Sequence, residues 1–301
     1  MTSQRTILIT GCSDHSLGAA LALAFHRAGG WRVFASARNP AKLQQVTAVG
    51  IETIGLDVSS EESILASVAA VEQLTGGGPL DALVNNAGAG FPLPILDADL
   101  DAARALFDLN VFAALRVTRA YVPLLLRSGA AAAGGGGGLL INHTSTGSQT
   151  AGSVPFHGVY NASKAALASL TEGLRLELAP FGVRVVNLVT GAVRSTSFFD
   201  NSPPATLPPG SLYDVARDEV EKSMSDEHTA ADGTEASVWA EAVVRDLSQA
   251  SPPHWVWRGR HATEVRLASH LPVGATDGIM RKVSGLDAVE RKIKDKGWKQ
   301  E

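Results

Sequence analysis

The sequence predicts a single doubly wound α/β domain, in which helices cover both faces of a parallel β-sheet. Short, nearly continuous apolar runs, typical of strands buried on both faces, alternate with stretches of helical periodicity. This alternation favours right-handed crossovers and therefore a parallel sheet. The chain of 301 residues is 45% apolar and 19% charged, a composition typical of a globular protein.

Six apolar runs are the expected strands, and four helical stretches lie between them. The strands are expected at residues 6–10, 31–35, 52–56, 81–85, 139–143 and 184–189. The helices are expected at residues 17–28, 61–74, 100–126 and 159–178. Together they predict one domain over residues 1–250, with its ligand site at the carboxyl ends of the strands.

Two segments interrupt the alternation. Residues 129–138 are almost entirely alanine and glycine, which is typical of a flexible surface connector. Residues 198–233 are rich in proline and small polar residues, with one helical stretch near 212–224, and long segments of this kind are often lids. The apolar residues of this lid indicate a fairly bulky, apolar substrate. The alternative is that they only hold the lid in place. These residues are Phe198, Phe199, Leu207, Leu212 and Tyr213.

The last segment, residues 251–301, is expected to add a strand and a basic amphipathic extension to the domain. Trp255 and Trp257 flank a valine, as in a strand. An apolar stripe with helical spacing follows, and basic residues lie among its polar positions; the stripe consists of Ile279, Val283, Leu286, Val289 and Ile293. It predicts a helix docked on the domain or on a second subunit, and the alternative is a basic helix on a membrane surface.

Charge and cysteine content exclude several classes of protein. With 26 basic and 30 acidic residues the net charge is −4, which argues against a general nucleic-acid binder. The single cysteine, Cys12, excludes a disulfide framework, and His15, His143, His157 and His261 lack metal-ligand spacing, so no metal is expected. No apolar run reaches the ~18 residues of a bilayer span, and no signal-peptide pattern precedes the first strand, so we expect a cytoplasmic protein.

The first expected strand runs into a glycine-containing loop that we expect to bind phosphate. Glycine lets the backbone turn sharply and approach a ligand, and the free N–H groups at the start of the next helix face an anion. The candidate contacts are Gly11, Ser13, Ser16, Leu17 and Gly18. The spacing departs from the general G-x-G-x-x-G pattern, so an ordinary strand–helix turn is the alternative.

The end of the second strand bears on which dinucleotide the loop would bind. A site for NAD usually carries a carboxylate here, which binds the ribose hydroxyl. In this chain Ala37 is followed by Arg38, whose guanidinium can pair with a 2′-phosphate. Arg38 therefore predicts NADPH over NADH, and the alternative is an ordinary exposed arginine at a helix start.

Tyr160 and Lys164 lie four residues apart in an expected helix, so their side chains share one helix face. A tyrosine with an ordinary pKa of about 10 exchanges protons poorly at neutral pH. A nearby ammonium stabilises the phenolate and lowers the pKa of the tyrosine. The pair could then give a proton to a developing alkoxide or take one from an alcohol.

In their order, these motifs resemble the short-chain dehydrogenases/reductases over residues 5 to about 197. The matching segments are Thr10-Gly11 with Leu17-Gly18, Asp57-Val58, Asn85-Asn86-Ala87-Gly88, Asn110, Ser145, Tyr160 with Lys164, and Thr190-Gly191-Ala192-Val193. Each segment lies where a doubly wound sheet builds its site. The resemblance implies a Rossmann-type fold that binds NADP(H), and a homodimer or homotetramer.

The resemblance also implies roles for these residues. Tyr160 would be the general acid, Lys164 would lower its pKa and bind the nicotinamide ribose, and Ser145 would hydrogen-bond the substrate carbonyl. Asn110 would hold a water that connects the lysine to solvent. The other residues would contact the cofactor, with Asp57 and Val58 at the adenine, Asn86, Ala87 and Gly88 at the adenine ribose, and Gly191, Val193 and Ser195 at the nicotinamide side.

The chain departs from the family's pattern at three places. The glycine loop is one residue longer and carries Asp14, whose charge is unfavourable near a phosphate. Thr190 stands where a proline is usual. The stretch from Ser145 to Tyr160 is also longer than usual, which makes Ser148 a second candidate for the serine role, although the strand-end position favours Ser145.

These observations together predict an NADPH-dependent reductase that transfers hydride reversibly to a ketone or aldehyde. Residues 156–166 and 175–183 resemble a subgroup that includes fungal 1-acyldihydroxyacetone-phosphate reductases and biosynthetic keto-reductases, which implies lipid or secondary-metabolite biosynthesis.

Two alternatives keep the same fold. One is an enzyme that uses bound NADP as a scaffold for cyclisation or isomerisation, and the other is a regulatory protein that senses NADP(H).

Overall fold

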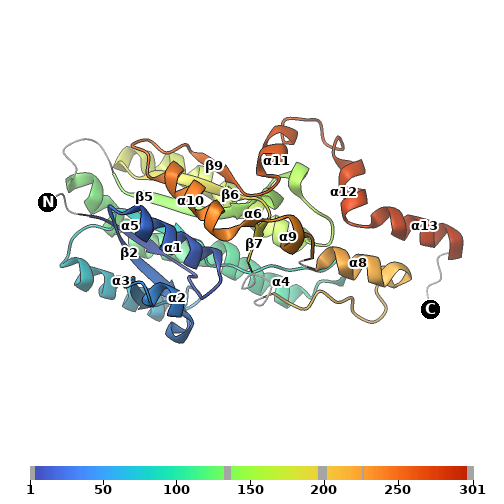
Figure 1. Ribbon diagram of the computed structural model, residues 1–301, viewed down its shortest axis with the longest axis horizontal. Helices are drawn as coiled ribbons and strands as arrows, with labels where there is room; N and C mark the ends of the chain where they lie inside the picture. Colours follow the sequence, from blue (N-terminus) through green and yellow to red (C-terminus); the bar gives the residue numbers. More distant parts are fainter. Residues whose placement is uncertain (1–3, 132–136, 196–201, 226, 297–301) are drawn as a thin grey trace.

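A computed structural model describes residues 4–131, 137–195, 202–225 and 227–296. Its centre is a seven-stranded sheet with the strand order β3-β2-β1-β4-β5-β6-β9, and all neighbouring strands in it are parallel. Helices lie on both faces of this sheet (Figure 1). The predicted doubly wound α/β fold is confirmed.

All six expected strands form, and the tail supplies the seventh. The sheet consists of β1 (Arg5–Ile9), β2 (Trp31–Ala37), β3 (Glu52–Gly55), β4 (Ala82–Asn85), β5 (Leu139–Ser145), β6 (Arg184–Thr190) and β9 (Trp255–Arg258), and a separate short pair joins β7 (Val193–Arg194) to β8 (Thr234–Glu235). The chain runs outward from β1 to β3 and then returns to place β4 on the other side of β1. Such a reversal opens a crevice at the carboxyl ends of the strands.

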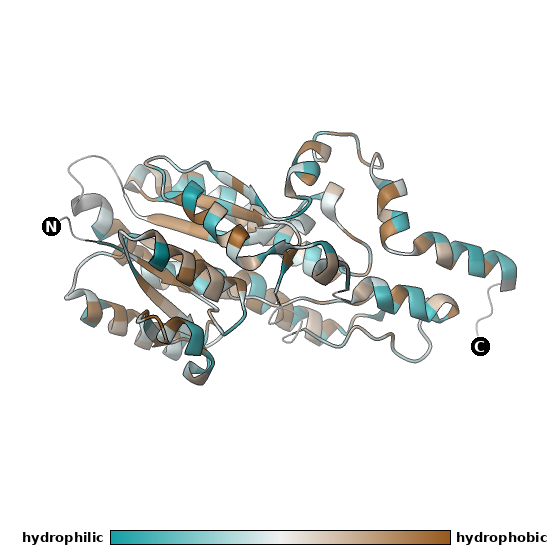
Figure 2. Ribbon diagram, viewed as in Figure 1, coloured by the Kyte–Doolittle hydropathy of each residue, from teal (hydrophilic) through white to brown (hydrophobic). Residues whose placement is uncertain are grey.

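The two faces of the sheet carry two separate cores. Alternate residues of β1 point in opposite directions, so Ile7 and Ile9 pack in one core while Leu8 packs in the other. The first core contains α1 (Leu17–Ala28) and α10 (Ala236–Leu247), and the second contains α3 (Glu61–Thr75), α5 (Ala113–Ala131) and part of α6 (Gly158–Leu178). Figure 2 shows the apolar residues gathered along the strands.

Several short helices complete the chain outside these layers. They are α2 (Gln44–Thr47) and the 3-10 turns Pro40–Lys42, Ile95–Asp97, Thr146–Ser148, Thr150–Gly152, Ala179–Phe181 and Asp214–Ala216. The helices of the lid and tail are α8 (Arg217–Met224), α9 (Glu227–Asp232), α11 (Ala262–Ala268), α12 (Asp277–Val283) and α13 (Leu286–Lys296).

The helix expected at residues 100–126 is interrupted. It consists of α4 (Leu100–Phe107), a π-helical segment (Asp108–Phe112) and α5. By length and mean hydropathy alone, the continuous stretch Leu100–Ser128 could cross a membrane. Its residues Val117, Tyr121 and Leu124 are instead buried against the sheet, as in a core helix.

The tail docks on the lid, but as two helices and not as the single helix that its stripe predicts. Gly285, with a φ of 76°, separates α12 from α13. Val289 of α13 is buried in a cluster with Val220 and Met224 of α8, and Lys292 pairs with Glu219 at 2.7 Å. The helices α8, α12 and α13 lie together at one end of the molecule (Figure 1).

Part of the lid and of the Ala/Gly connector lies outside the described residues, including Phe198 and Phe199. Of the other lid residues singled out, Leu207 is buried in the cluster that holds α13. Tyr213 packs edge-on against Phe156, with 5.1 Å between ring centroids. Leu212 is exposed. Leu207 and Tyr213 therefore hold the lid in place, as the alternative interpretation of these side chains expects.

Candidate active site

A cleft of about 660 Å³ lies at the carboxyl ends of the strands. Most of the predicted site residues line it: Gly11, Ser13, Ser16, Leu17, Arg38, Val58, Asn86, Ala87, Gly88, Ser145, Tyr160, Lys164, Gly191, Val193 and Ser195. The other three predicted residues, Gly18, Asp57 and Asn110, do not line it. In the described ranges, no group of three or more His, Cys, Asp and Glu side chains could hold a metal ion.

The glycine loop after β1 is closed by hydrogen bonds from its own side chains. Ser16 caps α1, because its hydroxyl accepts from the Ala19 N–H and donates to the Gly11 carbonyl, both at 3.0 Å. A Cβ on Gly18 would lie only 2.3 Å from the Gly11 carbonyl oxygen, so only glycine fits there. Gly18 therefore brings the start of α1 against the loop without lining the cleft itself.

Asp14, the extra charged residue of the loop, faces away from the cleft. Its carboxylate accepts hydrogen bonds from the backbone N–H groups of Gln44 and Gln45, at 3.2 and 2.8 Å. His15 adopts a left-handed backbone conformation, φ 63°, which accommodates the extra residue of the loop. Its N–H donates to the Gln45 side chain. The carboxylate is thus held by the backbone at the start of α2.

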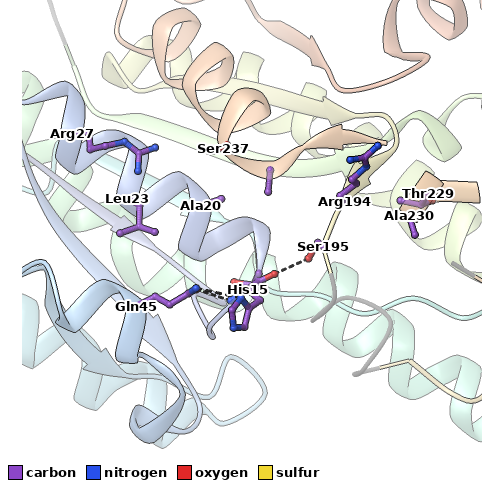
Figure 3. Close-up of a pocket in the computed structure, with 12 residues that line it drawn as sticks. His15, Ala20, Leu23, Arg27, Gln45, Arg194, Ser195, Thr229, Ala230 and Ser237 are labelled. Carbon is purple, nitrogen blue, oxygen red and sulfur yellow. Dashed lines mark hydrogen bonds between the residues drawn. The ribbon is translucent and has the colours of Figure 1, made fainter. Parts of the chain in front are cut away.

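The loop also contacts the segment that follows β7. The Ser195 hydroxyl donates to the His15 carbonyl at 3.0 Å (Figure 3). A side cavity of about 400 Å³ lies behind this contact, between α1 and α10, and both Arg27 and Arg194 line it. Arg27 pairs with Glu241 and Arg194 with Glu235, so both guanidinium charges are balanced.

Ser145, Tyr160 and Lys164 meet in the middle of the cleft. Lys164 Nζ donates to the His143 carbonyl at 2.9 Å and lies 5.9 Å from the centre of the Tyr160 ring. Tyr160 is hydrogen-bonded to Ser145. Ser148, the rival serine, does not line the cleft, and its hydroxyl accepts from the Gln149 side chain.

The pKa of Tyr160 moves opposite to the sequence-based expectation. Burial raises the pKa of Tyr160 to about 12, against the lowering effect of the Ser145 hydrogen bond. Burial also lowers the pKa of Lys164 to about 8. Both groups lose hydration in their charged forms, and this loss outweighs the attraction expected between ammonium and phenolate. The phenol is therefore protonated at neutral pH.

Asn110 supports the cleft from behind. Its Oδ1 accepts from the Ala89 N–H, and its Nδ2 donates to the Ala89 carbonyl and to Ser163, each at 3.0 Å. A Cβ on Gly88 would lie 2.9 Å from Asn110 Oδ1 and 3.5 Å from Lys164 Nζ. The π-helical segment therefore places this amide directly behind the lysine.

Comparison with known proteins identifies the family. Residues 5–205 match the family model of the short chain dehydrogenases. The chain belongs to this family. A short-chain dehydrogenase/reductase of Pestalotiopsis microspora is 41% identical over 296 residues, which cover 98% of this chain and 99% of that protein.

Two further relatives bear on function and fold. An NADPH-dependent 1-acyldihydroxyacetone phosphate reductase of Schizosaccharomyces pombe is 32% identical, covering 91% of this chain and 92% of that protein. The crystal structure of a short-chain dehydrogenase from Streptomyces avermitilis superposes with a TM-score of 0.74 and 28% identity, covering 97% of this chain and 98% of that chain. This short-chain dehydrogenase is thus an oxidoreductase acting on CH–OH and C=O groups.

Sequence reasoning missed several residues that line the cleft of this short-chain dehydrogenase. Those beside the expected motifs are Ala37, Leu56, Ala89, Leu109, Thr144, Gly147, Val154 and Asn161, and their closeness to those motifs in the sequence was a usable signal. Those from the lid and tail are Ser223, Ser225, Thr229, Asp232, His261 and Val283. Only the docking of these later segments brings them to the cleft, and the sequence does not show where on the domain they dock.

Proposed function

We propose that this short-chain dehydrogenase reduces a ketone or aldehyde with NADPH. The convergence of Ser145, Tyr160 and Lys164 in one cleft at the strand ends supports this proposal most directly. The cleft also suits a dinucleotide, because the loop after β1 and the first residue of α1 line it, and the N-terminus of a helix favours a bound phosphate. When bound, the cofactor supplies the hydride.

In the proposed reaction, two hydroxyl groups bind the substrate oxygen. Ser145 and Tyr160 already share a hydrogen bond, so a carbonyl oxygen placed between them would accept from both. These donors stabilise the charge that develops on that oxygen. Tyr160, kept protonated by burial, gives up its proton, and the Lys164 ammonium stabilises the phenolate that remains.

We propose NADPH as the preferred cofactor because Arg38, directly after β2, lines the cleft. Its exposed guanidinium is free to meet a 2′-phosphate. The NADPH-dependent relative in S. pombe is consistent with this preference.

Replacing Arg38 with alanine tests the preference. We expect R38A to lose about tenfold or more in kcat/KM for NADPH, the size of one charge-assisted contact, with little change for NADH. Arg104, which is exposed and pairs with Asp101 away from the cleft, provides the matched control R104A. Equal use of both cofactors by the wild type, or an equal loss with both in R38A, would contradict the preference.

We propose a bulky substrate from lipid or secondary metabolism, because the cleft is large and the lid and the tail also line it. Val154 and His157 line this part, together with Ser223 of the lid and Val283 of the tail. Burial lowers the pKa of His157, so its imidazole is neutral. The described part of residues 198–233 would close over the substrate and exclude water.

A panel of carbonyl compounds tests the reaction itself. Purified protein is mixed with NADPH and ketones or aldehydes of increasing chain length, and loss of absorbance at the nicotinamide band is followed together with alcohol formation. We expect stoichiometric reduction, fastest with long or multi-ring substrates. Conversion of a ligand to an isomer or ring-closed product without loss of NADPH would instead favour the scaffold alternative.

A further inference from the structure

His143 is a buried imidazole next to the cleft that the proposed reaction leaves unused. It lies near the end of β5, is 7% exposed, and its ring stacks on Trp239 at 5.5 Å between ring centroids. Both ring nitrogens have polar partners on neighbouring segments. Nδ1 lies 2.8 Å from Asn86 Oδ1, just after β4, and Nε2 lies 2.7 Å from Thr190 Oγ1, at the end of β6.

The direction of each hydrogen bond follows from Asn86. The Asn86 Nδ2 donates to the backbone carbonyls of Thr10 and Gly11, at 2.7 and 3.1 Å. The amide therefore presents its oxygen to His143, and Nδ1 of the ring must carry the proton. In a neutral imidazole the other nitrogen is then an acceptor, so the Thr190 hydroxyl donates to Nε2. Burial lowers the pKa of His143 to about 3, which keeps this neutral form at all ordinary pH values.

This hydrogen-bond chain connects both walls of the cleft. Asn86 and Gly11 line the side expected to take the adenine ribose, and Thr190 directly precedes Gly191 on the nicotinamide side. The backbone carbonyl of His143 also accepts from Lys164 Nζ at 2.9 Å. One residue of β5 is thus bonded to the segment after β4, to the end of β6 and to the lysine of α6, and through Asn86 it is connected to the loop after β1.

We propose that His143 is a positioning residue, which holds Asn86, Thr190 and Lys164 at the spacing that the nicotinamide cofactor requires. This inference rests on the proposed function, because it assumes that the cofactor lies between those walls. His143, Thr190 and Lys164 are buried and Asn86 is partly buried, so a lost hydrogen bond leaves an unsatisfied polar group that relaxes by moving the wall.

Thr190 allows a sharp test, because valine has nearly the same shape but no hydroxyl. Loss of one buried hydrogen bond predicts that T190V binds NADPH about five- to tenfold more weakly, with a lower kcat. T190S, which keeps the hydroxyl, should recover most of the lost affinity. H143L, which removes both bonds, should bind the cofactor more weakly than T190V does.

Thr171 supplies the matched control. It is buried behind the same strand, and its hydroxyl accepts from Asn142 of β5, but it does not line the cleft. We expect T171V to lower the melting temperature at least as much as T190V while NADPH affinity stays unchanged. If T190V and H143L lower only the melting temperature and bind the cofactor like T171V, the residue is merely structural and the inference is wrong.

Two further measurements separate this inference from the proposed function. The dissociation constants are measured for both NADPH and NADH. A wild type that binds only NADH would refute the cofactor preference. T190V would then still test the positioning role, with NADH as the ligand. Nitrogen-15 NMR of the His143 ring in the cofactor-free protein should show the neutral Nδ1–H form, with the Nε2 signal shifted in T190V. The other tautomer in the wild type would overturn the hydrogen-bond chain itself.

Discussion

Burial determines the protonation of both Tyr160 and Lys164. It raises the pKa of Tyr160 to about 12 and lowers the pKa of Lys164 to about 8. The sequence could place these two groups on one helix face, because that depends only on helical geometry. It could not predict the direction of the tyrosine shift, because burial depends on segments far away in the chain.

The rate of carbonyl reduction should therefore fall as the pH rises through about 8. Lys164 loses its proton there, while Tyr160 remains protonated. The measurement is kcat/KM for the carbonyl substrate between pH 6 and 10. A rate that stays constant from pH 7 to 10 would show that the ammonium does not take part.

The same lysine should make stability rise with pH above about 8. Its folded pKa lies below the ordinary value of 10.5, so the unfolded chain binds more protons between about pH 8 and 10.5. The contribution of this one group is measured as the difference between wild type and K164M in urea unfolding at pH 7 and pH 10. No pH-dependent difference between the two proteins would contradict the lowered pKa.

Burial also determines the reactivity of Cys12. It lies in the glycine loop, yet it is fully buried, and burial raises the pKa of its thiol to about 12. We expect it to resist alkylation by iodoacetamide in the folded protein and to react once the chain is unfolded in denaturant. Rapid labelling of the native protein, followed by mass spectrometry, would contradict this burial.

At the scale of elements, strands were easier to predict than helix packing. A strand covered on both faces carries consecutive apolar residues, such as 7–9 in β1 and 139–141 in β5, and this pattern needs no knowledge of the neighbouring elements. The widened turn at Asn110 leaves no such mark, since the apolar spacing continues through it. The sequence predicted that the tail helix docks on the domain or on a second subunit, but α10 and the choice of α8 as the docking site depend on tertiary contacts and were not predicted.

The contact between α13 and α8 should help to shape the substrate part of the cleft. Val289 is buried in this contact, and a charge there should undock α13 and loosen the lid. We expect V289D to raise KM for the carbonyl substrate about fivefold or more with little change in NADPH affinity. The control is I279D, because Ile279 is 61% exposed on the preceding helix. Identical kinetics of the two variants would show that the contact does not affect the cleft.

At the scale of the whole molecule, one surface combines several exposed apolar side chains. Leu100 and Phe112 lie on α4 and the π-helical segment, and Leu170 and Leu176 lie on α6, which packs beside them. Apolar surface of this kind usually marks an interface, and members of the short-chain dehydrogenase family generally oligomerise. We therefore expect a second copy of this chain to cover the surface.

Light scattering combined with size-exclusion chromatography tests this expectation. The wild type should elute as a dimer or larger, and the double variant F112D/L176D as a smaller species. L267D is the control, since Leu267 is equally exposed on α11, away from this surface. A monomeric wild type, or the same shift in L267D, would contradict an interface on α4 and α6.

The most direct test of the proposed chemistry is Tyr160→Phe, which removes one hydroxyl and keeps the ring. The account predicts that Y160F binds NADPH with wild-type affinity but reduces the carbonyl substrate about 10² to 10⁴ times more slowly, as expected for loss of a general acid. Cofactor binding is measured by fluorescence titration and turnover by single-turnover kinetics. Turnover at the wild-type rate would show that Tyr160 does not supply the proton.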